Sequence, residues 1–140
     1  MKKIAILGLA AASLLALGAC GSAPGAAKNG SDKGNAIGKT FKIGLNMELS
    51  GAYAAPGNAE KNAIQLAADE INAAGGINGK KIQLVIKDNK TDNGEVATVA
   101  SNLTNNDKVA AIIGPMSSGG TLAATPNVTK AQVPLITPTG

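Results

Sequence analysis

The sequence predicts an α/β fold, a parallel sheet with helices on both faces, over residues 40–140. Segments with the two-residue alternation of a strand take turns with segments that have the spacing of a helix. In addition, the continuous apolar run Val109–Gly114 is typical of a strand that is covered on both faces. Strands and helices in alternation join parallel neighbours, so right-handed crossovers are expected.

The first predicted strand begins at Phe41, where apolar residues alternate with others as far as Glu48. A loop punctuated by glycine and proline follows, Leu49–Asn58. Helical spacing then starts, and it ends at Gly75 or Gly76, which suit a helix stop. Apolar residues at that spacing predict the buried face of this helix: Ala59, Ala63, Leu66, Ala67 and Ile71.

The second strand and helix repeat this order. Ile82, Leu84 and Ile86 alternate with their neighbours and predict a strand. Asp92 and Glu95 have the spacing of a capping box, so a helix should begin there. One face of that helix is expected to be buried: Val96, Val99, Ala100 and Leu103.

The run Val109–Gly114 is the third predicted strand, and a third helix should start near Ser118. Pro126 lies inside this helix and is expected to kink it. The fourth strand is Val133–Thr137. Ligands of open parallel sheets bind beyond the carboxyl ends of the strands. The candidate binding loops are therefore those that follow Met47, Asp88, Gly114 and Thr137.

The first 39 residues have the pattern of an export signal and a tether. Lys2 and Lys3 precede the apolar run Ile4–Leu17, which is short for a membrane span and predicts a signal peptide over residues 1–19. An anchoring helix or a buried helix is the alternative. Small and polar residues dominate positions 20–39, which predicts a flexible tether between the signal and the folded region at 40–140.

The stretch Leu17–Cys20, "LGAC", resembles the bacterial lipobox. The resemblance implies that Cys20 receives a lipid and that the protein is held at the extracytoplasmic face of the bacterial cell membrane. The acyl chains would supply roughly 0.8 kcal/mol of membrane affinity per buried methylene. A free cysteine in a core is the alternative.

Composition argues against several classes of function. The chain has no histidine and one cysteine, which leaves no histidine-dependent catalysis, internal disulfide or cysteine-rich metal site. Eight lysines balance eight acidic residues over 40–140, so a nucleic acid partner is not expected. The stretch Asp88–Gly94 only partly matches a calcium loop, because Lys90 occupies a ligand position. With no phosphate-loop or dinucleotide motif, neither a metal nor a cofactor is predicted.

The turn after the third strand, Ile112–Thr121 ("IIGPMSSGGT"), is the most informative stretch. Unpaired N–H groups of Ser118, Gly119 and Gly120 could bind an anion at the start of the helix, aided by the helix dipole and by the Ser118 hydroxyl. From these residues alone, an ordinary serine N-cap explains the pattern equally well.

Two other side chains near the candidate loops leave alternatives open. Met116 could line an apolar pocket or fill the core, and Tyr53 could contact a ligand or pack down its loop. A nucleophilic role for Ser118 is not expected, because the sequence has no histidine base and no GxSxG elbow.

Four blocks, in order and spacing, closely resemble the type I periplasmic-binding-protein family, and most of all the leucine/isoleucine/valine-binding proteins of ABC importers. The resemblance extends from Phe41 to Gly140. The blocks that carry it are "IGLNMELSGAYAAPG", "AADEINAAGGINGKKIQLVIKDNKTD", "VAAIIGPMSSGGT" and "VPLITPT".

The resemblance implies a ligand-binding site. Ser118 would meet the ligand α-carboxylate through its hydroxyl and N–H, and Met116 and Ser117 would border the ligand side chain. Thr139 would offer its carbonyl to the ligand ammonium. Tyr53 is the nearest aromatic residue to a position in the first loop that often touches the ligand, although Pro56 takes the aligned place.

The resemblance also implies a function without catalysis. The protein would be a lipid-anchored receptor that closes two lobes around a free amino acid, with leucine, isoleucine or valine favoured, and delivers it to the permease of an ABC importer. A ligand-sensing module of a signalling receptor with the same fold is the alternative. Since members of the family are more than twice as long, the chain is expected to be part of a first, incomplete lobe, and to bind amino acids weakly or not at all by itself.

Overall fold

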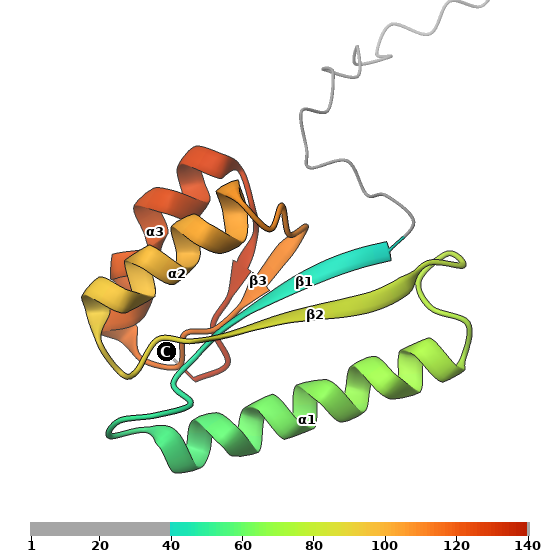
Figure 1. The fold of residues 1–140 in the computed structure, drawn as a ribbon, viewed down its shortest axis with the longest axis horizontal. Helices are drawn as coiled ribbons and strands as arrows, with labels where there is room; N and C mark the ends of the chain where they lie inside the picture. Colours follow the sequence, from blue (N-terminus) through green and yellow to red (C-terminus); the bar gives the residue numbers. More distant parts are fainter. Residues whose placement is uncertain (1–39, 140) are drawn as a thin grey trace, which may run out of the picture. The chain divides into compact units, whose positions relative to one another are not determined.

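The computed structural model describes residues 40–139, which form a four-stranded parallel sheet with helices on both faces (Figure 1). The predicted fold class is therefore confirmed. In chain order the elements are β1 (Thr40–Met47), α1 (Ala54–Ala73), β2 (Lys81–Asp88), α2 (Asn93–Asn105), β3 (Ala111–Ile113), α3 (Ser118–Ala131) and β4 (Leu135–Ile136). The predicted signal peptide, Cys20 and the tether lie outside the described residues.

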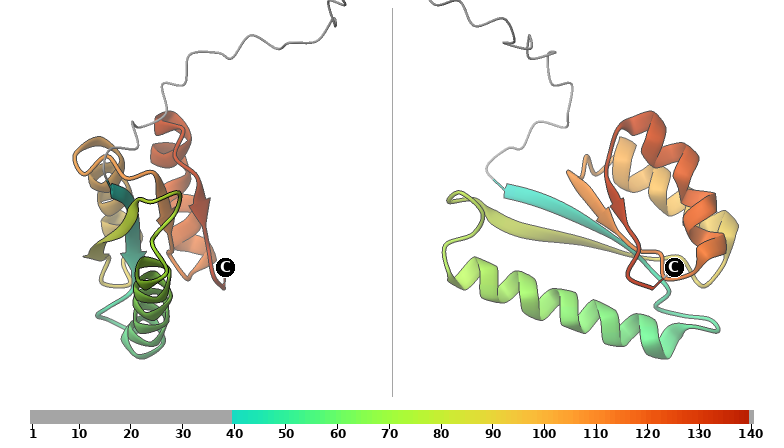
Figure 2. Two further views of the ribbon diagram at one scale, coloured as in Figure 1. Left: turned by 90° about the vertical axis from the view of Figure 1, so that its right-hand side faces the viewer. Right: turned by 180° about the vertical axis from the view of Figure 1, so that it is seen from behind.

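The strand order in the sheet is β2-β1-β3-β4, and all the pairs are parallel. The helix α1 lies on one face of the sheet, while α2 and α3 lie together on the other (Figures 1 and 2). The chain passes from β1 to β2 on one side and then crosses to β3 on the other side of β1. The loops after β1 and β3 consequently leave the sheet in different directions, which is the arrangement that opens a crevice at the carboxyl ends of the strands.

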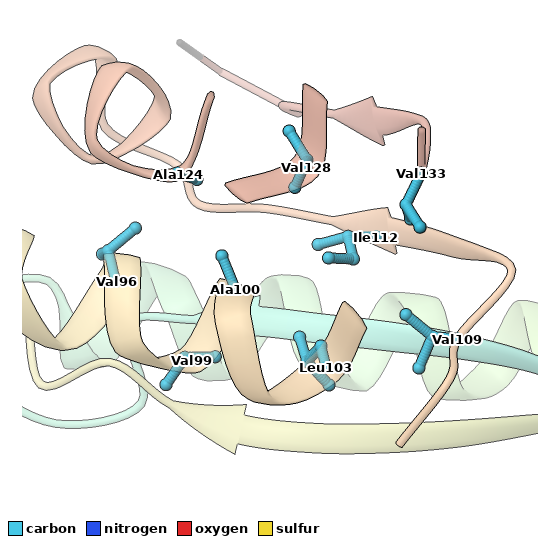
Figure 3. Packing of buried hydrophobic residues seen from close by; sticks show 9 residues of the cluster. All are labelled: Val96, Val99, Ala100, Leu103, Val109, Ile112, Ala124, Val128 and Val133. Carbon is cyan, nitrogen blue, oxygen red and sulfur yellow. The ribbon is translucent and has the colours of Figure 1, made fainter. Parts of the chain in front are cut away.

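The main hydrophobic core fills the space between the sheet and the helix pair α2 and α3 (Figure 3). The predicted inner face of α2 is confirmed, since Val96, Val99, Ala100 and Leu103 are all buried there. Asp92 caps this helix as predicted, because its carboxylate accepts a hydrogen bond of 2.9 Å from the N–H of Glu95. The cluster is completed by residues of β3, α3 and the adjoining loops: Val109, Ile112, Ala124, Val128 and Val133.

The predicted buried face of α1 is wrong. Ala59, Ala63, Leu66, Ala67 and Ile71 are all exposed, and Leu66 retains 60% of its accessible surface. The helix instead turns Gly57, Ala68 and Asn72 inward. The side-chain amide of Asn72 donates to the carbonyl of Ile82 and accepts from its N–H, at 2.8 and 2.7 Å. A polar side chain that hydrogen-bonds the backbone of Ile82 in β2 therefore lies on the inner face of α1, where helical periodicity predicts apolar side chains.

Some predicted boundaries also change. The helix α1 begins at Ala54, so the second half of the predicted loop Leu49–Asn58 is helical. The strand β1 is buried on both sides from Gly44 to Met47, because it is central in the sheet and covered on both faces. The helix α3 continues through Pro126 without a break. None of the helices in the described region is both long and apolar enough to cross a bilayer.

Candidate functional site

The turn between β3 and α3 begins with a backbone that only glycine fits well. Gly114 has a φ of +89°, and an added Cβ would lie 2.3 Å from the carbonyl oxygen of Asn46 in β1. The following peptide bond, Gly114–Pro115, is cis. The turn therefore lies against the carboxyl end of β1, at the crossing point of the sheet.

Ser117 is the N-cap of α3. Its hydroxyl oxygen accepts a hydrogen bond of 3.2 Å from the N–H of Gly120, and its carbonyl accepts one of 2.9 Å from the N–H of Thr121. An ordinary serine N-cap, the alternative that the sequence left open, is therefore correct for Ser117. Ser118 is the first residue of the helix. The N–H groups of Ser118 and Gly119 lie in the first turn of α3, where the helix offers them no carbonyl acceptor. Within the described chain they have no hydrogen-bond partner. These two donors are consequently available to a ligand.

The carboxylate of Glu48 accepts hydrogen bonds from this turn and fixes its backbone. Glu48 is the residue after β1 and is fully buried. The N–H of Met116 donates to both carboxylate oxygens at 3.2 Å, and the N–H and hydroxyl of Ser117 donate to Oε1 at 3.4 Å. The sequence pattern did not predict a role for Glu48. The available signal was an acidic residue directly at the end of a central strand, where burial requires hydrogen-bond partners.

Two threonines beyond β4 hold the carbonyl groups of the same turn. The hydroxyl of Thr137 donates to the carbonyl of Pro115 at 2.7 Å, and the hydroxyl of Thr139 donates to the carbonyl of Met116 at 3.1 Å. With Glu48 on the N–H groups and the threonines on the carbonyls, the backbone of the turn is fixed from both sides before any ligand arrives. Such a turn is pre-organised to present Ser118 and Gly119.

The loop after β1 is tied to the loop after β2. Asp88 accepts hydrogen bonds of 2.6 to 3.1 Å from the Ser50 hydroxyl and from the N–H groups of Leu49, Ser50 and Lys90. Thr91 donates its hydroxyl hydrogen to the carbonyl of Ser50, and its oxygen accepts from the N–H of Tyr53 at 3.3 Å. Burial alone would raise the pKa of Asp88, but these hydrogen bonds together lower it below its ordinary value of 3.8.

The five residues predicted from the sequence for the ligand site line one pocket of about 290 Å³: Tyr53, Met116, Ser117, Ser118 and Thr139. They come from three loops at the carboxyl edge of the sheet. The side chains of Tyr53, Ser118 and Thr139 are exposed, and Tyr53 retains 48% of its surface. None of the five residues carries a charge. Across residues 40–139 no cluster of three or more metal-ligating side chains occurs.

A second carboxyl group lies near Glu48. Burial, and then the negative charge of Glu48, raise the pKa of Glu60 on α1 above its ordinary value of 4.5. The Oε2 atom of Glu60 is buried and has no hydrogen-bond partner in the described part of the chain. Two carboxyl groups thus influence each other here, and one of them, Glu48, contacts the turn whose uncharged side chains line the pocket.

The chain matches the family described as periplasmic binding protein over residues 40–140. An amino acid binding protein of Pseudomonas aeruginosa is 38% identical over 96 residues, which cover 69% of this chain and 26% of that protein. The branched-chain amino acid transporter substrate binding protein LivJ from Streptococcus pneumoniae, solved with isoleucine, is 57% identical with a TM-score of 0.70, and the match covers 71% of this chain and 29% of that one.

A solved solute binding protein of an ABC transporter from Rhodopseudomonas palustris, in complex with 3,4-dihydroxybenzoic acid, is 37% identical with a TM-score of 0.65. The match covers 71% of this chain and 27% of that one. The names of all three relatives describe binding proteins and not enzymes. The chain spans about a quarter of the length of each of them.

Proposed function

The chain belongs to the periplasmic binding protein family, and on this premise we propose that it is part of an extracytoplasmic receptor that captures a free amino acid for an ABC importer. The favoured ligands are leucine, isoleucine and valine. Two similar proteins support this choice, one named as an amino acid binding protein and one solved with isoleucine. The delivery partner would be the permease of the importer.

The observation that carries the proposal is the pair of N–H groups at Ser118 and Gly119, which have no partner within the described residues, beside an uncharged pocket that Ser118 lines. Two backbone donors, the start of a helix and the Ser118 hydroxyl together suit a carboxylate. Met116 and Tyr53 offer apolar surface for an aliphatic side chain, and the carbonyl of Thr139 is an acceptor for the ligand ammonium. Capture of this kind needs no covalent step, since it depends on hydrogen bonds and apolar contact alone.

A thermal-shift panel of amino acids on the full-length protein tests the proposal. A ligand at a hundredfold over its Kd should stabilise the protein by about 2.7 kcal/mol. Ser118→Ala should weaken binding by about 1 kcal/mol or more, because a hydrogen bond to a charged carboxylate is lost. The control Thr129→Ala, on the exposed side of the same helix, should leave the shift unchanged. Normal binding by Ser118→Ala would show that the carboxylate lies elsewhere.

We further propose that residues 1–19 are a signal peptide and that Cys20 carries the lipid that anchors the protein, with residues 20–39 as a tether. In cells fed labelled palmitate, the wild-type protein should take up label and sediment with membranes. Cys20→Ala should lose the label, whereas the control Ser22→Ala should keep it. Labelled Cys20→Ala protein would contradict the assignment of this cysteine.

A further inference from the structure

Glu48 places a negative charge directly behind the wall of the pocket. Met116 and Ser117 line the pocket, and the N–H groups of the same two residues donate to the Glu48 carboxylate. Among the described residues, the Glu48 side chain accepts all of its hydrogen bonds, from the N–H of Met116 and from the N–H and hydroxyl of Ser117. The next N–H along the chain is that of Ser118, which is one of the two donors left for a ligand.

Within the described region the Glu48 carboxylate has no ion-pair partner. The ion pairs there are Lys87 with Asp107 and Lys90 with Glu95, and neither involves Glu48. The start of α3 supplies about half a positive charge, which is less than the full negative charge of Glu48. The raised pKa of Glu60 agrees with this surplus, because burial and the charge of Glu48 are its causes.

A carboxylate ligand at Ser118 would therefore meet hydrogen-bond donors in front and a buried negative charge behind them. An added ammonium group on the ligand cancels the repulsion, since a zwitterion brings both signs to the site. A simple organic acid brings only the negative charge. The distinction is relevant in this family, because one solved relative holds 3,4-dihydroxybenzoic acid and another holds isoleucine.

We propose that Glu48 is a specificity-determining residue that restricts the Ser118 pocket to zwitterionic amino acids and rejects carboxylic acids that lack the ammonium group. The inference rests on the proposed function, because it assumes that the ligand carboxylate binds at Ser118 and Gly119. It adds a discriminating group that does not touch the ligand and acts through its charge.

The test compares leucine with 4-methylpentanoate, which has the same carbon skeleton without the ammonium group. Calorimetry on the full-length protein gives both dissociation constants, and the wild type should bind leucine far more tightly. Glu48→Gln keeps the size of the side chain and removes its charge, so the preference for leucine should fall about tenfold or more. If another amino acid binds best in the thermal-shift panel, it and its own deaminated acid replace this pair.

Two variants separate charge from loop geometry. Glu48→Asp keeps the charge on a shorter side chain, so both ligands should weaken while the preference for leucine remains. Glu70→Gln removes one negative charge from an exposed site on α1 and should change neither constant. Equal weakening of both ligands in Glu48→Gln, with the preference intact, would overturn the inference and make Glu48 a purely structural residue.

The inference stays testable if Glu48→Gln does not fold. A wild-type protein that binds 4-methylpentanoate as tightly as leucine would overturn it, and so would a Glu48→Asp variant that loses the preference. The proposed function fails differently, because in that case the wild type binds no amino acid of the panel. If the wild type binds an amino acid and Glu48→Gln keeps the same preference for it over the deaminated acid, the inference about Glu48 is overturned and the proposed function stands.

Discussion

Asp88 and Glu48 illustrate how single carboxylates build this site. Each stands at the carboxyl end of a strand and accepts several hydrogen bonds from a loop that borders the pocket. Asp88 holds the loop that leads to Tyr53, while Glu48 holds the turn that leads to Ser118. A charged acceptor with several N–H donors is among the stronger hydrogen-bonding arrangements in proteins, so each loop has little freedom without a ligand.

The pKa of Asp88 leads to a pH prediction. Because the folded pKa is lowered from 3.8, its contribution to stability is present above about pH 4 and is lost as the pH falls through the folded pKa. Asp88→Asn should therefore lower the Tm of the full-length protein by a few degrees at pH 7. The difference from wild type should shrink as the pH falls below 4.

Thermal unfolding between pH 3 and pH 7 measures this difference, with Asp69→Asn on the exposed face of α1 as the control. The control should differ little from wild type throughout the range. A Tm difference for Asp88→Asn that stays constant across the pH range would show that the charge of Asp88 is not what stabilises the loop.

At the level of single residues, the sequence predicted the pocket lining but not its support. Ser118 and its neighbours stand in a contiguous motif, and Tyr53 and Thr139 lie in loops that follow predicted strands. Glu48 was missed because its partners lie 68 and 69 positions away along the chain. Neither spacing nor composition shows which turn a buried carboxylate will meet. Only the strand order brings the end of β1 beneath the turn after β3.

The helices and strands were predictable where one side faces an apolar core. The helix α2 has a capping residue and an apolar stripe, and both predictions are confirmed. The prediction of the buried face of α1 was wrong because close backbone contact decides which side of this helix faces the sheet. An added Cβ at Gly57 would lie 2.0 Å from the carbonyl oxygen of Glu48, so the absence of a side chain permits this close approach. Hydropathy counts such a glycine as neutral and therefore points to the wrong side of the helix.

The whole chain contains the fold of the type I periplasmic binding proteins only in part. The parallel sheet and its helices agree with the solved LivJ structure, yet the match covers 29% of that protein. The pocket has five lining residues, and three of them have exposed side chains. Small-molecule sites usually bury 70–90% of the ligand surface. A ligand at Ser118 would therefore leave much of its surface in water unless a second lobe covers it.

We accordingly expect residues 1–140 alone to bind leucine weakly or not at all, and the full-length protein to bind it well. Calorimetric titration of both proteins measures the difference, and circular dichroism shows whether the shorter chain retains its helices. The pre-organised turn supplies the carboxylate donors in either case, so the lost affinity should come from the contacts that a second lobe would add around the ligand. Micromolar leucine binding by residues 1–140 would contradict this and would mean that the turn and its pocket are sufficient for capture.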